Sequence, residues 1–145
     1  MIRRIIALLL LTSLQLFAQE YDDTLLSIEA KLFPKIAMLE KHIKEKESST
    51  LSFVIVAEEV DISTAEVLKS KILKNYPDKI LNKKIRIEIK KPRDILEMNI
   101  DAIIVLHHSS KTLKEIALWA NRHNILTFSY DPYDLQYGIT ASIYL

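Results

Sequence analysis

The chain has 145 residues, of which 49% are hydrophobic and 27% are charged, and this balance predicts a single compact domain. A formal net charge of +1 provides too weak a field to hold a nucleic-acid backbone, which argues against a nucleic-acid partner. The absence of cysteine excludes disulfides, thiolate metal sites and a cysteine nucleophile. The only glycine, Gly138, excludes the glycine-rich loops that cradle phosphates.

The first nineteen residues have the pattern of a secretory signal peptide. Two arginines precede an apolar run from Ile5 to Leu11, and this run is too short to span a bilayer of ~30 Å. We expect cleavage near Ala18 or Gln19, with an uncleaved anchor as the alternative. The mature domain, residues 20–145, is then exported to the periplasm without stable membrane insertion.

Apolar residues at helical spacing predict a helix from Asp23 to Glu45, with a kink or break close to Phe33 because Pro34 lacks an amide donor. Nearly continuous apolar runs at Leu51–Ala57 and Asp101–Leu106 predict strands that are buried on both faces.

Strict alternation from Lys84 to Lys90 predicts a strand at or near a sheet edge. A helix capped by Asp61 or Ser63 precedes it, and a helical turn at residues 92–98 follows it. Further along, we expect a helix capped by Ser109 or Ser110 and a strand at residues 125–129. A turn at residues 131–137 and a last strand at residues 139–145 complete the chain.

Helices and strands therefore alternate, and their connections have the length that parallel crossovers require. The predicted fold is a three-layer α/β domain, with about five mostly parallel strands flanked by helices, following the signal peptide. No internal boundary is apparent, so residues 20–145 form one domain.

In such a sheet, ligands bind beyond the carboxyl ends of the strands. The polar residues that follow the strands should therefore share one rim, and they are the candidate ligand-binding residues: Glu58, Asp61, His107, His108, Tyr130 and Asp131.

The His107-His108 pair allows two interpretations. The imidazoles could bind a metal or act as acid and base, or one could pack under a helix while the other caps a loop. Adjacent strand residues point to opposite faces, and no spaced ligand signature accompanies the pair, so we assign no metal and no cofactor. Ser109 and Ser110 are interpreted as helix caps, because the glycines of a nucleophile elbow are missing. The late tyrosines suit either a contact face or half-buried packing.

Several segments together resemble the YfiR-like family of periplasmic proteins. They are IEAKLFPKIAMLEKHI, SFVIVA, KKIRIEIKK, DAIIVLHHS, NILTFSYDP and YGITASIYL, and the most telling passage runs from DAIIVL to ILTFSYDPYDLQYGI. The resemblance implies a non-enzymatic regulator that binds the extracytoplasmic part of an inner-membrane signalling protein, such as a diguanylate cyclase, and so controls cyclic di-GMP. Some relatives have redox-sensitive cysteines, which this chain lacks. Relatives usually continue through a closing helix, whereas this sequence stops at Leu145, so the last strand is uncovered or the sequence is incomplete.

Three hypotheses follow. The first is this periplasmic regulator, acting alone or as a homodimer, and the second is a domain that binds a small ligand or solute at the predicted rim. The third and weakest is a hydrolase built on Ser109 and His108. A receiver-like phosphoacceptor domain is rejected, because His107 holds the place of its aspartate.

Overall fold

The computed structural model describes residues 21–96 and 98–144. The predicted signal peptide, residues 1–19, lies outside the described residues, as does Leu145 at the end of the predicted last strand. Within the described ranges, none of the helices combines the length and the hydrophobicity needed to cross a bilayer.

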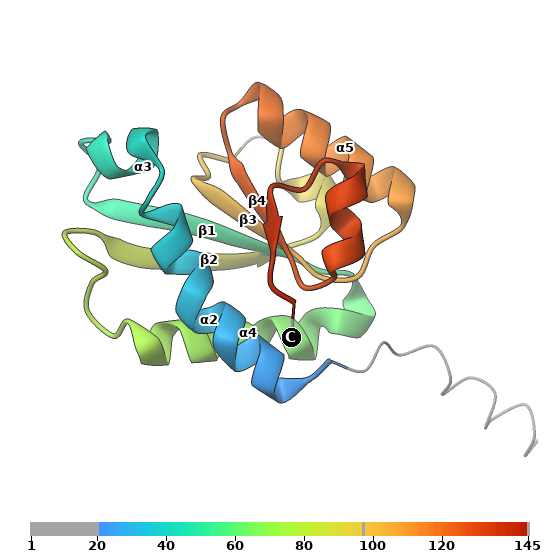
Figure 1. Cartoon of the computed structure of the whole chain (residues 1–145), viewed down its shortest axis with the longest axis horizontal. Helices are drawn as coiled ribbons and strands as arrows, with labels where there is room; N and C mark the ends of the chain where they lie inside the picture. The colour runs from blue at the N-terminus through green and yellow to red at the C-terminus, as the bar shows by residue number, and fades with distance from the viewer. Residues whose placement is uncertain (1–20, 97, 145) are drawn as a thin grey trace, which may run out of the picture.

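A five-stranded sheet forms the centre of the molecule (Figure 1). Its spatial order is β2-β1-β3-β4-β5, and every neighbouring pair is parallel. The strands are β1 (Thr50–Val56), β2 (Lys84–Lys90), β3 (Ala102–Val105), β4 (Leu126–Ser129) and β5 (Ala141–Ser142). This architecture confirms the predicted α/β fold, including the edge position of β2.

Helices cover both faces of the sheet, which makes three layers (Figure 1). One face carries α2 (Asp23–Ala37) and α4 (Ile62–Asn75), and the other carries α5 (Ser110–Arg122). Short helical segments fill the connections: α3 (Lys41–Glu45) and the 3-10 helices η1 (Glu59–Asp61), η2 (Pro92–Asp94) and η3 (Pro132–Tyr137).

The two halves of the core lie on opposite faces of the same strands. On the α2 face, the Phe33 ring stacks on Phe128 with ring centroids 4.6 Å apart, and Phe53 of β1 lies beside Phe128. On the α5 face, Ile103 of β3 packs into the cluster that holds Ile116. Successive strand side chains point to opposite faces, so the apolar runs of β1 and β3 supply both halves.

The prediction of a helix from Asp23 to Glu45 with a kink or break close to Phe33 is wrong about where the helix is interrupted. α2 continues through Pro34 to Ala37, and residues 38–40 form a turn before α3 begins. Proline loses only the hydrogen bond that its own amide would donate, and the Pro34 carbonyl still accepts from the Met38 N–H at 3.1 Å. The helix therefore survives for one more turn.

The last strand is shorter than residues 139–145, because β5 contains only Ala141 and Ser142. Before it, the Thr140 N–H donates to the Thr127 hydroxyl at 2.9 Å instead of joining the backbone ladder. Gly138 ends η3 with φ +97°, and a Cβ there would lie 3.3 Å from the Cβ of Ala117. The left-handed backbone conformation favours glycine at this position, and a Cβ would also require Ala117 to shift slightly.

Candidate functional site

The chain reverses its winding direction between β1 and β3. β1 leads into α4 on one face of the sheet, whereas its neighbour β3 leads into α5 on the other face. Parallel sheets form a crevice at the carboxyl ends of two such strands, and ligands bind there. The six residues predicted from the sequence follow β1, β3 and β4 at this edge, but the structure divides them between the two faces.

His108 lies on the α5 face and is buried. Its Nε2 is 3.0 Å from the Val56 carbonyl oxygen, and its Nδ1 is 3.6 Å from a carboxylate oxygen of Glu58. A carbonyl can only accept, so the hydrogen-bond network assigns a hydrogen to Nε2. In the neutral ring Nδ1 is then an acceptor, and it has no hydrogen-bond partner. His108 donates to Glu58 only when both ring nitrogens carry hydrogens.

His107 has different surroundings from His108. Its side chain is exposed, and its backbone N–H donates to the Tyr21 hydroxyl at 3.0 Å. Over residues 21–96 and 98–144, no three His, Asp or Glu side chains are arranged to hold a metal ion. The adjacent histidines thus differ in burial and in partners, and both lie beyond the end of β3 at Val105.

A tyrosine cluster closes the crevice on the α2 face. The rings of Tyr21 and Tyr130 meet edge to face with centroids 4.7 Å apart, and the Asp22 N–H donates to the Tyr130 hydroxyl at 2.7 Å. Burial raises the pKa of Tyr21 above its usual range, the nearby Asp61 carboxylate adds to this rise, and the His107 N–H opposes it. Asp61 and Tyr130 therefore belong to a packed cluster that holds the start of α2 against the sheet.

Asp131 has a structural partner of its own, because its carboxylate accepts from the Tyr133 N–H at 2.9 Å and caps η3.

Beside Asp131, the Ser129 hydroxyl donates to Asp134, which is 7% exposed. Burial raises the pKa of Asp134 above its usual value, while the Ser129 hydrogen bond acts in the opposite direction. Asp134 has no signal in the sequence, because η3 brings it back under β4 only in the folded chain.

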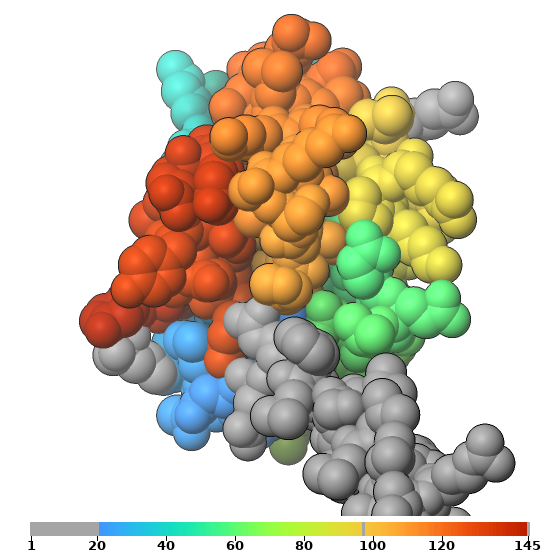
Figure 2. All heavy atoms as spheres, turned by 90° about the vertical axis from the view of Figure 1, so that its right-hand side faces the viewer, coloured from blue at the N-terminus to red at the C-terminus, as the bar shows by residue number. Residues whose placement is uncertain are grey.

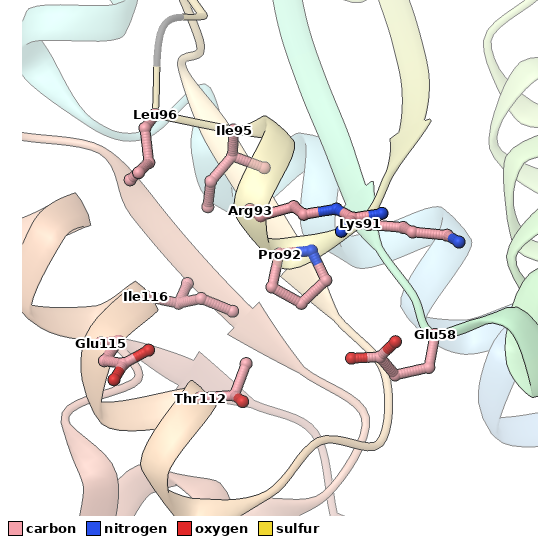
Figure 3. Close-up of a pocket in the computed structure, with 9 residues that line it drawn as sticks. All are labelled: Glu58, Lys91, Pro92, Arg93, Ile95, Leu96, Thr112, Glu115 and Ile116. Atoms are coloured by element: carbon pink, nitrogen blue, oxygen red, sulfur yellow. The ribbon is translucent and has the colours of Figure 1, made fainter.

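A cavity of about 700 Å³ opens between the connection that follows β2 and the first turns of α5, and we call it the α5 cavity (Figure 3). Among its described residues, the crossover from β2 to β3 contains η2 and no longer helix, so α5 has no helical neighbour from this segment. In the space-filling view, the orange surface of α5 faces the yellow segment after β2 across this hollow (Figure 2). The lining residues are Glu58, Lys91, Pro92, Arg93, Ile95, Leu96, Thr112, Glu115 and Ile116.

Glu58 is the one predicted site residue that lines the α5 cavity. The other lining residues are not among the predicted ones, because the predicted residues follow the first, third and fourth strands and not β2. Lys91 directly follows β2, and this position is a signal that could have identified it. Thr112 and Glu115 are three residues apart on α5, a spacing that places both on one face of a helix.

Comparisons of the chain with protein-family models, with curated proteins and with solved structures find no match.

Proposed function

We propose that this protein is a non-enzymatic binding protein that takes a small ligand in the α5 cavity and acts outside the cytoplasm. The cavity carries this proposal. Its volume of about 700 Å³ falls within the roughly 300–1,000 Å³ of small-molecule sites, and it lies at the carboxyl edge of a parallel sheet beside the winding reversal. An apolar interior with a few charged groups is also the usual composition of such sites.

The local hydrogen bonds favour binding over catalysis. The Ser109 hydroxyl caps α5 by accepting from the Thr112 N–H, and its oxygen lies 3.0 Å from the Thr112 hydroxyl. His108 is committed to the Val56 carbonyl through Nε2. The nucleophile and base of the hydrolase hypothesis therefore both have structural partners, whereas that reaction needs them to be bonded to each other.

A ligand panel tests the proposal by thermal denaturation. A ligand at 100 times its Kd stabilises the folded state by about 2.7 kcal/mol, which is a readily measured rise in Tm. Leu96→Trp should narrow the cavity and abolish the rise, because Leu96 lines the cavity and is 58% exposed. Leu39→Trp is the matched control, because Leu39 is 81% exposed and is not among the lining residues. A panel of metabolites that leaves Tm unchanged would contradict ligand binding.

Regulation of a membrane signalling protein, such as a diguanylate cyclase, is the second candidate function. The resemblance to the YfiR-like family supports it, and so does the exposure of aromatic side chains near the carboxyl terminus. Tyr133 of η3 is 77% exposed and Tyr144 is 83% exposed, and large aromatic side chains are enriched in protein interfaces. In this proposal, binding of the ligand in the α5 cavity regulates the contact with the membrane partner.

Cross-linking on intact cells tests the second candidate. We expect a membrane protein with an extracytoplasmic domain to be captured by the wild-type protein and lost with Tyr133→Asp. Capture of transport components alone would contradict regulation, and a cross-linked product of twice the chain mass would identify a homodimer instead. Sequencing the amino terminus of the protein from the periplasmic fraction checks export, with a start near Glu20 expected.

A further inference from the structure

We infer that the α5 cavity selects a small organic cation, a molecule with a protonated amine on an apolar body. This inference rests on the proposed ligand-binding function and adds the chemical class of the ligand. Three observations carry it: the apolar surface of the cavity, the direction of its two carboxylates, and the partners of its two basic side chains.

The apolar surface comes from both walls of the cavity. Ile116 of α5 and Pro92 of η2 point toward its centre, and Ile95 lies above them (Figure 3). Ile95 and Ile116 are almost fully buried, so the positions of these side chains are fixed by the core behind them. A ligand that fills this space must present an apolar body to it, because a polar group there would lose hydrogen bonds to water without replacement.

The two carboxylates are directed into the cavity from different elements. Glu58 extends from the loop after β1 toward α5, and Glu115 rises from α5 toward the same space (Figure 3). Among the described residues, neither carboxylate has a lysine or arginine nitrogen within 4.0 Å. The one basic nitrogen within 4.0 Å of either carboxylate, among the described residues, is Nδ1 of His108, which lies 3.6 Å from Glu58.

The basic side chains find their partners at the rim. The Lys91 amine lies 3.5 Å from a Glu59 carboxylate oxygen and extends away from Glu115 (Figure 3). The Arg93 Nε lies 3.8 Å from the carboxylate of its neighbour Asp94. Lys91 and Arg93 thus pair with carboxylates outside the cavity, whereas Glu58 and Glu115 inside it pair with no lysine or arginine among the described residues.

His108 leaves the hydrogen-bonding capacity of Glu58 open to a ligand. Its Nε2 is used by the Val56 carbonyl, and its Nδ1, 3.6 Å from a Glu58 carboxylate oxygen, makes no hydrogen bond. An ammonium group supplies the donors that both carboxylates lack, and such charge-assisted hydrogen bonds are the strong ones. An anionic ligand would instead be repelled by the carboxylates that line the cavity.

Three probes that share a phenyl ring and differ in charge test this inference: 2-phenylethylammonium, 2-phenylethanol and 3-phenylpropanoate. Binding is measured on the purified protein by titration calorimetry, with amide chemical shifts locating the site. We expect the ammonium to bind about tenfold more tightly than the alcohol, which is about 1.4 kcal/mol, because a charge-assisted hydrogen bond is stronger than a neutral one. The carboxylate should bind most weakly.

Glu58→Gln and Glu115→Gln should each lower the affinity for the ammonium about tenfold and leave the alcohol unchanged. Both positions are exposed, so the fold should tolerate the substitutions. Glu45→Gln is the matched control, because it removes the same charge from α3, whose residues are not among the lining residues. An affinity for the ammonium that is the same in the two cavity variants as in the wild-type protein would overturn the inference.

The outcomes also separate this inference from the proposed function. Tighter binding of 3-phenylpropanoate, lost with Arg93→Gln, would overturn the cationic ligand while retaining a small-ligand site in the α5 cavity. Absence of binding by 2-phenylethylammonium would overturn it as well. The proposed function itself fails only if the broader metabolite panel also leaves Tm unchanged.

Discussion

Glu29 shows how burial of one side chain in this fold affects protein stability. It lies on the inward face of α2, is 0% exposed, and neither carboxylate oxygen has a hydrogen-bond partner. Burial raises the pKa of Glu29 from 4.5 to about 8, because water can no longer solvate the charged form. At neutral pH the folded protein therefore holds this proton, whereas the unfolded chain releases it.

This difference predicts a fall in stability as the pH rises. Between pH 4.5 and about 8 the unfolded chain binds fewer protons at Glu29 than the folded chain, so the free energy of unfolding decreases through this window and the cost is absent below it. One pKa unit corresponds to about 1.4 kcal/mol, so Glu29 should make the protein about 2–3 kcal/mol less stable at pH 7 than at pH 5. Urea denaturation across this range measures the slope.

Glu29→Gln removes the titrating group and should remove that part of the slope. Glu45→Gln, an exposed substitution on α3, should retain it. Parallel pH profiles for the wild-type protein and Glu29→Gln would show that Glu29 does not hold a proton in the folded state.

At the scale of elements, the amino ends of the strands are joined through Asp101. This side chain is 7% exposed and precedes β3; one carboxylate oxygen accepts from the Ser52 N–H of β1 and the other from the Lys46 amine, both at 2.8 Å. The amine of Lys83, which is 1% exposed, donates to the carbonyls of Lys46 and Ser48 in the same loop. These bonds fix the segment from α3 to β1 against the sheet.

Asp101→Asn should therefore destabilise the protein by about 1–3 kcal/mol, because the amide keeps one acceptor but turns a donor toward the Lys46 ammonium. Urea denaturation measures the change. Asp78→Asn, an exposed substitution beyond α4, should change the stability by less than about 0.5 kcal/mol. Equal effects of the two substitutions would mean that the bonds of Asp101 contribute little to the fold.

At the scale of the whole molecule, the strands of the sheet differ in how many neighbouring strands and helices cover them. β1 and β3 lie inside the sheet with helices on both faces, whereas β2 and β5 each have one neighbouring strand within the part of the chain that the structure describes. β5 is also short, and its pairing with β4 covers only Ala141 and Ser142. Edge strands open at a lower free energy than a central strand, because fewer buried contacts are lost.

Native-state hydrogen exchange should reveal this order. We expect the amides of Ile55 and Ile104, in the central strands, to exchange only through global unfolding, and those of β5 to exchange many times faster through local opening. Exchange followed by NMR measures both. Equally slow exchange in β5 and β3 would show that β5 is held by contacts beyond its two paired residues.

Local chemistry allowed much of this fold to be predicted. The alternation of isoleucines predicted Lys84–Lys90 as a strand at or near a sheet edge. Ser109 or Ser110 was predicted as a cap, because a hydroxyl before an amphipathic run satisfies the first helical amides, and the cap is Ser109. These features depend on neighbours within a few residues along the chain. The end of α2 at Ala37 was missed, because turn bonds near residue 38 decided it rather than Pro34.

The sequence by itself therefore determined the layers, the parallel sheet and the edge at which ligand-binding residues should gather, since hydrophobic periodicity and connection length are local properties. Only the tertiary structure decided which residues meet there. It separated Glu58 and His108 from Asp61 and Tyr130, brought Glu115 opposite Glu58, and buried Glu29 without a partner. Contacts between residues that are distant in the sequence depend on the crossovers and on which face of the sheet each helix covers. The spacing of residues along the chain does not encode these contacts.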